Sequence, residues 1–113
     1  MPHPRNYGTN VRVLGKYVRE EGVLTLEDAI RKMTSLPAQV LGLQERGILK
    51  PGFYADIVLF DADTVSDTNS FEFPKSYARG VPYVLVNGKL VIDRGLHTGA
   101  AAGRVLRGPA YQP

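Results

Sequence analysis

Hydrophobic positions along the chain follow two different periods. Between residues 9 and 42 apolar side chains recur three or four positions apart, as they do on one face of a helix. Between residues 48 and 106 they come in short β-branched runs separated by glycine and proline, which is typical of strands and turns. The pattern therefore predicts an α+β chain with N-terminal helices followed by a small antiparallel β-sheet.

The first helical segment has recognisable start and stop signals. Thr9 or Asn10 can accept hydrogen bonds from the free backbone N–H groups of a first turn, and Gly22 can adopt the left-handed conformation that ends a helix. We therefore expect a helix between these residues. Its apolar stripe consists of Val11, Leu14 and Val18.

A second helical segment begins with Thr25, and Asp28 three residues later completes a pattern that resembles a capping box. Pro37 disfavours helical geometry in the residue before it and suits the first turn of a new helix. We therefore expect a break at residues 35–36 and then a short helix that ends near Gly42.

The second half of the chain carries two strong strand signals. The run IVLF at residues 57–60 is apolar at consecutive positions, which predicts a strand covered on both faces. Asn87 and Gly88 tolerate positive φ and stand between two β-branched runs, which predicts a two-residue hairpin turn. Residues 61–80 are polar and irregular, and the small-residue tail contains one candidate strand at residues 104–106.

Composition and charge narrow the function classes. The net charge of the 113 residues is +3, but basic and acidic residues alternate along the chain, which is typical of a solvated surface. We therefore expect no nucleic-acid partner. The absence of cysteine excludes disulfides, thiolate metal sites and a cysteine nucleophile.

Hydropathy predicts no association with a membrane. The longest apolar run has four residues, whereas a membrane span needs about 18. The N-terminus shows no basic region followed by an apolar stretch, so we see no signal peptide. The chain is expected to be cytoplasmic.

The residue types that carry chemistry do not form a complete catalytic or metal site. His3 and His97 are the two histidines, and neither belongs to an HxH or HExxH pattern. Asp56, Asp61 and Asp63 fall at the two ends of a predicted strand, where carboxylates cap turns. We therefore assign no catalytic residue and no metal ligand to this chain.

Arg5 is the one candidate for ligand binding. Its planar, permanently charged guanidinium can donate two parallel hydrogen bonds to a carboxylate, and Pro2 and Pro4 stiffen the backbone on both sides. The alternative is an exposed side chain at a frayed terminus. The residues alone leave both interpretations open.

Several motifs resemble one known family. HPRNYGT at the start, KMTSLPA in the second helical segment, GFYADIVLFD and VLVNGKLV together resemble the C-terminal part of N-acyl-D-amino-acid deacylases, or D-aminoacylases. These are zinc-dependent enzymes of the amidohydrolase superfamily. The resemblance covers nearly the whole chain, and the combination of HPRNYGT with KMTSLPA is its most specific part.

The resemblance implies a fold in which a metal-bearing (β/α)8 barrel joins a small β-sandwich. On that plan residues 1–8 are the loop after the last barrel strand, and residues 1–45 comprise this active-site loop and the closing helices of a truncated barrel. Residues 46–113 form a partial β-sandwich domain with a C-terminal tail. Met1 fits an internal methionine of a longer reading frame, the start of a truncated gene or a cloning boundary.

The resemblance also implies a function: hydrolysis of N-acyl-D-amino acids by metal-activated water in the intact family. It places the zinc ligands and the catalytic Asp upstream of this chain, so we expect no cofactor here and no activity from the chain alone. It implies that Arg5 binds the substrate carboxylate, while His3 and Tyr7 match flanking positions without an assigned role.

Two alternatives remain at this point. The chain can be a non-catalytic assembly or binding module, or it can be one half of a split amidohydrolase. A sandwich without its other strands leaves sheet edges and apolar helix faces uncovered. We therefore expect self-association or pairing with an upstream barrel fragment.

Overall fold

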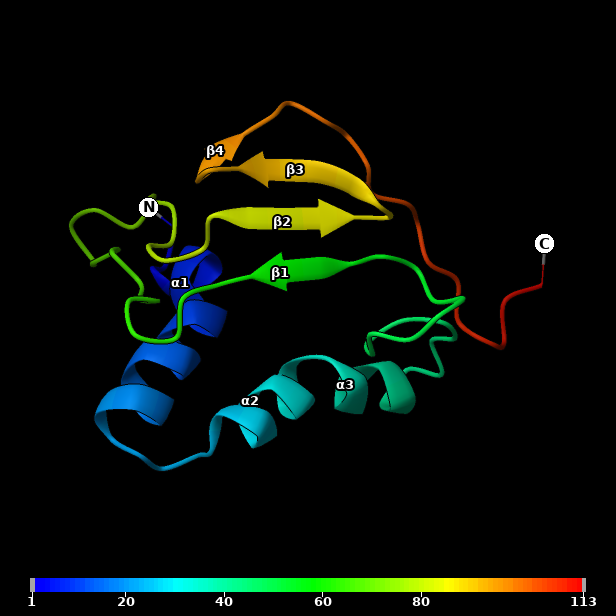
Figure 1. Cartoon of the computed structure of the whole chain (residues 1–113), viewed down its shortest axis with the longest axis horizontal. Helices are drawn as coiled ribbons and strands as arrows, with labels where there is room; N and C mark the ends of the chain where they lie inside the picture. The colour runs from blue at the N-terminus through cyan, green and yellow to red at the C-terminus, as the bar shows by residue number, and fades with distance from the viewer. Residues whose placement is uncertain (1, 113) are drawn as a thin grey trace.

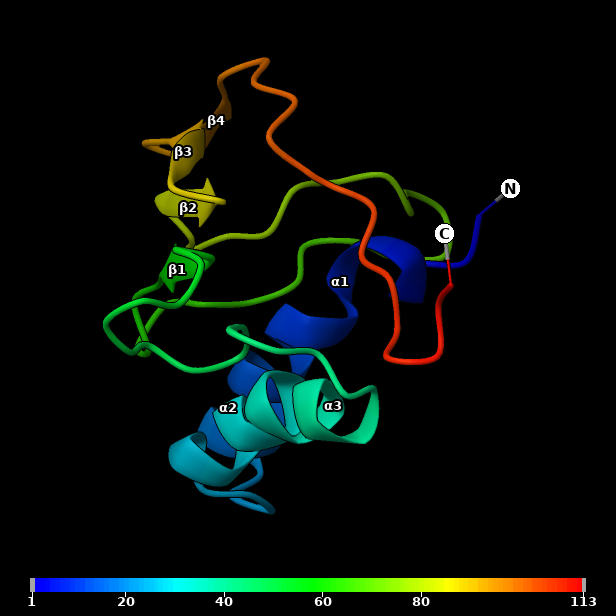
Figure 2. The ribbon, with the colours of Figure 1, turned by 90° about the vertical axis from the view of Figure 1, so that its right-hand side faces the viewer.

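The computed structural model describes residues 2–112, so that Met1 and its origin lie outside the described residues. The chain forms helices first and then a four-stranded antiparallel sheet of order β1-β2-β3-β4, which confirms the α+β prediction. Figures 1 and 2 show the sheet above helices α2 and α3. The elements are α1 (Arg5–Arg12), its π-helical continuation η1 (Val13–Glu20), α2 (Leu26–Met33), α3 (Ser35–Val40), β1 (Ile57–Leu59), β2 (Tyr83–Val86), β3 (Lys89–Asp93) and β4 (Leu96–His97).

The first helix begins earlier than its polar residues predict. Helix α1 starts at Arg5, so the expectations of a start at Thr9 or Asn10 and of a loop over residues 1–8 are wrong for residues 5–8. Pro4 already has helical geometry (φ −52°), and its carbonyl oxygen accepts hydrogen bonds from the backbone N–H groups of Tyr7 and Gly8. Thr9 lies inside the helix, where its hydroxyl donates to the Arg5 carbonyl oxygen at 2.5 Å.

The predicted capping signals at the other helix ends are confirmed. Gly22 has a φ of +61° after the end of η1, and the Thr25 hydroxyl accepts from the backbone N–H of Asp28 at 3.2 Å. The break between α2 and α3 lies at Thr34 instead of residues 35–36. Pro37 is the third residue of α3, where its missing N–H removes no intrahelical hydrogen bond.

The core lies where the helices meet the irregular segment at residues 61–80. Leu14 of η1, Ala29 of α2 and Val65 of the segment are buried together. Arg19 ties the same segment to η1, because its guanidinium donates to the carbonyl oxygens of Ala62 at 3.1 Å and Val65 at 2.7 Å. A backbone bridge between Ser66 and Arg79 closes the segment into a long loop, and its irregular course confirms the prediction.

Turn capping accounts for two of the three aspartates. The Asp61 carboxylate accepts from the hydroxyl of Thr64 at 2.8 Å and from the backbone N–H of Asp63 at 2.9 Å. These hydrogen bonds, with Thr64 as the larger cause, lower the pKa of Asp61. The Asp56 carboxylate accepts from the backbone N–H of Asn87 at 2.8 Å. Asp63 contributes its backbone N–H to the turn instead of its carboxylate.

The hairpin between β2 and β3 forms as predicted. Asn87 and Gly88 have φ of 51° and 76°, as a two-residue turn of this kind requires. The Asn87 side chain accepts from the guanidinium of Arg46 at 2.6 Å and donates to the Ala102 carbonyl oxygen at 2.7 Å. The turn therefore also anchors the C-terminal tail.

Two strand predictions are wrong. The IVLF strand was expected to be covered on both faces, but Val58 is 55% exposed and Leu59 is 47% exposed. Strand β1 pairs only with β2 among the described residues, and no second layer of residues 2–112 packs on these side chains. Residues 104–106 form no strand, because the tail runs over the surface without a neighbouring strand to pair with.

Candidate functional site

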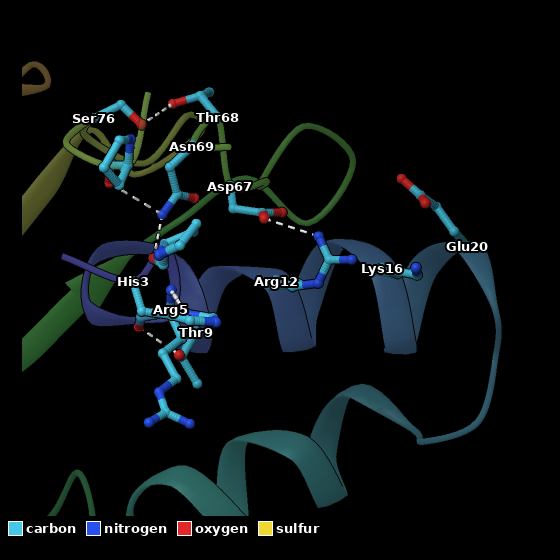
Figure 3. A network of polar contacts seen from close by, with 12 residues as sticks. His3, Arg5, Thr9, Arg12, Lys16, Glu20, Asp67, Thr68, Asn69 and Ser76 are labelled. Atoms are coloured by element: carbon cyan, nitrogen blue, oxygen red, sulfur yellow. Dashed lines mark hydrogen bonds and ion pairs between the residues drawn. The ribbon is translucent and has the colours of Figure 1, made fainter. Parts of the chain in front are cut away.

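A groove of about 600 Å³ lies between the start of α1 and residues 67–72 of the long loop. Figure 3 shows the polar contacts that join these two parts. The groove is lined on one side by Arg5, the residue that the sequence predicted for ligand binding, and by its motif neighbour His3. It is therefore the candidate functional site.

Arg5 stands at the first position of α1 with its side chain exposed. Its backbone N–H donates to His3 Nδ1 at 3.1 Å, but its guanidinium has no hydrogen bond or ion pair with any residue of the described range 2–112. In Figure 3 this guanidinium points away from Asp67 and Asn69. A charged planar guanidinium without a hydrogen-bond partner among the described residues is chemically suited to a carboxylate.

His3 is held in place by the long loop. Its ring meets the ring of Phe71 edge-on, with centroids 5.1 Å apart and an interplanar angle of 80°. Since His3 Nδ1 accepts the Arg5 backbone N–H, the ring also supports the start of α1. Tyr7, the other residue of the opening motif, is about half exposed.

Asn69 joins the loop to the start of the helix. Its Nδ2 donates to the Pro4 carbonyl oxygen and, at 3.5 Å, to that of Pro74. Gly8 leaves the room for this contact, because a Cβ atom at position 8 would lie 2.3 Å from Asn69 Oδ1. The side chain of Asn69 in the loop therefore packs directly against the backbone of the first turn of α1.

The second arginine of the groove is not available in the same way. Arg12 Nη1 lies 3.0 Å from Asp67 Oδ2, and this ion pair raises the pKa of the guanidinium. Arg12 therefore fastens the loop to α1, whereas the Arg5 guanidinium forms no ion pair with residues 2–112.

The histidines do not form a metal site. His3 precedes α1, whereas His97 lies in β4, where its Nδ1 accepts from the backbone N–H of Gly99 at 2.9 Å. Within residues 2–112 no three histidine, cysteine, aspartate or glutamate side chains come close enough to hold a metal ion.

No helix formed by these residues is long and apolar enough to cross a membrane.

Comparison with known proteins gives the family. The model of the amidohydrolase family matches residues 1–92, which is most of the chain. The chain belongs to the amidohydrolase family. Its motifs HPRNYGT and KMTSLPA, which resemble those of deacylases, can therefore be compared with named members of this family.

This amidohydrolase chain is 50% identical over 106 residues to the N-acyl-D-glutamate deacylase of Alcaligenes xylosoxydans xylosoxydans. The aligned region covers 94% of this chain and 22% of that protein. A solved D-aminoacylase superposes with a TM-score of 0.89 at 51% identity over 92% of the chain and 22% of the other. The N-acyl-D-glutamate deacylase of Bordetella bronchiseptica, solved with zinc and a phosphonate inhibitor, superposes with a TM-score of 0.83 at 48% identity, covering 91% and 21%. The predicted resemblance to D-aminoacylases is confirmed, and the chain spans about a fifth of the length of these relatives.

The described residues of the amidohydrolase chain do not fit the zinc that its relative contains. A zinc site needs three or four ligands, and residues 2–112 bring no such group together. We therefore derive no chemical step at a metal from this chain. The basic side chains that line the groove are those of His3, Arg5 and Arg12, and Arg12 is paired with Asp67.

The sequence singled out Arg5 as a site residue, assigned no role to His3, and missed Asn69 and Phe71. These two residues lie in the irregular loop, and Asn69 is 65 positions from its partner Pro4. No periodicity or short motif connects positions so far apart. The only local signal was the polar, irregular character of residues 61–80.

Proposed function

We propose that the chain is the C-terminal part of an N-acyl-D-amino-acid deacylase and is inactive alone. In the assembled enzyme Arg5 binds the carboxylate of the N-acyl-D-amino acid. The observation that carries this proposal is the exposed Arg5 guanidinium, unpaired within residues 2–112, on a chain half identical to N-acyl-D-glutamate deacylase. Half-identity over 94% of the chain supports the same substrate class.

The proposed role is orientation of the substrate. Amide hydrolysis in the family uses metal-activated water, which residues outside this chain would hold. Arg5 would donate two hydrogen bonds to the substrate carboxylate and so place the scissile amide. Helix α1 carries this side chain, and its backbone contacts with His3 and the loop limit its movement.

The proposed architecture follows the two halves of the chain. Residues 1–45 would close a (β/α)8 barrel, and residues 46–113 would contribute to a β-sandwich. The exposed apolar side chains of β1 support this arrangement, because a strand with Val58 and Leu59 uncovered favours a further layer or strand.

The same exposed strand favours the second candidate, an assembly module. We expect the chain by itself to self-associate through β1 at micromolar concentration. Light scattering across a concentration series measures this, with a double substitution Val58→Lys and Leu59→Lys as the variant that should remain monomeric. A wild-type chain that stays a 12.4 kDa monomer at high concentration would contradict the assembly prediction.

A chimera tests the deacylase proposal. The matching 22% of D-aminoacylase is replaced by this chain, and zinc content and hydrolysis of N-acetyl-D-amino acids are measured. Because half of the residues are identical and the backbones superpose closely, we expect activity within about tenfold of the parent, a free-energy difference of about 1.4 kcal/mol. The isolated chain, assayed beside it, should be inactive.

The outcomes separate the candidates. A folded, zinc-loaded chimera without deacylase activity would refute the proposal and leave the assembly module. Activity on mixing the chain with a separately expressed barrel fragment, without covalent linkage, would support the split amidohydrolase.

A further inference from the structure

Arg5 must be held in one position to bind a carboxylate with two hydrogen bonds. Its guanidinium makes no hydrogen bond or ion pair with residues 2–112, so its placement depends on the backbone at the start of α1. We propose that Asn69 is a positioning residue for substrate binding, which holds this backbone through the Pro4 carbonyl oxygen. The inference rests on the proposed function, because it assumes that Arg5 binds the substrate carboxylate.

The Pro4 carbonyl oxygen is where the loop acts on the helix. It accepts from the backbone N–H groups of Tyr7 at 3.0 Å and Gly8 at 3.2 Å, and also from Asn69 Nδ2. The peptide plane that contains this oxygen also contains the backbone nitrogen of Arg5. The amide of Asn69 therefore determines the orientation from which the Arg5 side chain departs.

The packing around Asn69 restricts its amide to this position. Its side chain is half-buried, and its Nδ2 also reaches the Pro74 carbonyl oxygen within the same loop. The missing side chain at Gly8 gives Oδ1 its place, since a Cβ atom there would lie 2.3 Å away. A half-buried amide with two acceptors and a close backbone neighbour has little freedom to rotate.

Neighbouring contacts hold the rest of this unit. The ring of Phe71 meets His3, whose Nδ1 accepts from the Arg5 backbone N–H, and Asp67 pairs with Arg12 one helical turn beyond Gly8. These contacts fasten the loop along α1, whereas Asn69 touches the peptide unit next to Arg5. Of the three loop residues Asp67, Asn69 and Phe71, Asn69 is therefore the one that contacts the Pro4–Arg5 peptide unit directly.

A small displacement is enough to affect binding. A shift of about 1 Å in a positioning group can reduce kcat/KM by up to about 100-fold, because a bidentate hydrogen bond tolerates little misalignment. The shift would weaken carboxylate binding without touching the atoms that react. Its signature is therefore a change in KM instead of kcat.

The experiment uses the active chimera with Asn69→Ala and Asn69→Asp. The aspartate keeps the size of the side chain but has no N–H to donate. Thr68→Ala is the matched control, since Thr68 is the preceding loop residue and bonds Ser76 and the Tyr77 carbonyl oxygen, away from α1. We expect both Asn69 variants to raise KM for an N-acetyl-D-amino acid about tenfold, a loss of about one hydrogen bond, with kcat nearly unchanged.

Two comparisons separate positioning from a structural role. On the carboxamide analogue of the substrate, which Arg5 cannot grip with its charge, the Asn69 variants should equal the parent chimera. In an Arg5→Ala background, Asn69→Ala should have no further effect on KM. Equal losses on acid and carboxamide, or a fall in kcat with unchanged KM, would overturn the inference.

The outcome also distinguishes this inference from the proposed function. If Arg5→Ala raises KM but the Asn69 variants behave like Thr68→Ala, Asn69 does not position Arg5 and the proposed function stands. If Arg5→Ala itself has no effect, the proposed function fails first.

A measurement on the full 113-residue chain needs no activity. Trypsin cleaves after Arg5, and the rate at the bond to Asn6 reports how firmly the first turn of α1 is held. We expect Asn69→Ala to speed this cleavage at least threefold relative to the wild type and to Thr68→Ala. Equal rates in all three proteins would contradict the positioning role.

Discussion

Replacement of Arg5 by alanine in the chimera is expected to lower kcat/KM for N-acyl-D-amino acids by about 100- to 1,000-fold. Loss of a charge-assisted, two-point contact with a carboxylate costs about 3–4 kcal/mol, and each 1.4 kcal/mol is a factor of ten. Folding should be nearly unaffected, because the Arg5 side chain is exposed and its guanidinium has no partner within residues 2–112. Steady-state kinetics and a thermal melt measure the two effects separately.

Three controls sharpen this test. Arg104→Ala removes another exposed arginine, distant in sequence from the groove, and should leave kinetics unchanged. Arg5→Lys keeps the charge but loses the planar fork, so we expect an intermediate loss. The carboxamide analogue should be hydrolysed poorly by the parent chimera and no worse by Arg5→Ala. Acid and carboxamide hydrolysed equally well with Arg5 intact would refute the carboxylate role.

Replacement of Gly80 by alanine is expected to destabilise the chain by about 3 kcal/mol. Gly80 has a φ of +74°, which costs an alanine about 1–2 kcal/mol. Its added Cβ would lie 2.7 Å from both the backbone nitrogen and Cα of Val65, a fully buried residue of the core. Overpacking against backbone atoms adds about 1–3 kcal/mol, and urea denaturation followed by circular dichroism measures the sum.

Gly95→Ala is the matched control for Gly80→Ala. Gly95 has a φ of +80°, but a Cβ there would meet no atom within 4 Å. It should therefore lose only the conformational part, about 1–2 kcal/mol. Equal losses of stability from the two substitutions would mean that the backbone at Val65 moves to accommodate the added Cβ. The close contact between Gly80 and this core residue would then contribute nothing to the loss.

The elements that the sequence predicted correctly depend on hydrogen bonds between near neighbours. The Thr25 cap and Asp28 are three residues apart, and the turn at Asn87 and Gly88 depends on two adjacent φ angles. Propensity and spacing describe such contacts fully. The resemblance of HPRNYGT and KMTSLPA to deacylases likewise came from local motifs.

The wrong predictions concern positions whose conformation or burial depends on residues that are distant in the sequence. Helix α1 begins at Arg5 and not at Thr9. The Pro4 carbonyl oxygen accepts hydrogen bonds from backbone N–H groups of the helix and from the Asn69 side chain of the long loop, which stabilises this early start. The strand at residues 57–60 was expected to be covered on both faces, but Val58 and Leu59, which point to opposite faces, are both exposed within residues 2–112. An apolar run predicts that a strand is buried, but it does not show which element of the structure packs against it.

The sequence by itself determined the order of helices and strands, the main turns, the amidohydrolase resemblance and the single candidate Arg5. Only the tertiary structure brought Asn69 and Phe71 to the start of α1 and showed that, among residues 2–112, Arg12 has an ion-pair partner and Arg5 has none. The physical reason is distance along the chain. Local motifs encode contacts within a few residues, whereas the groove joins positions 65 apart, and these meet only after the long loop has packed its Val65 between the helices.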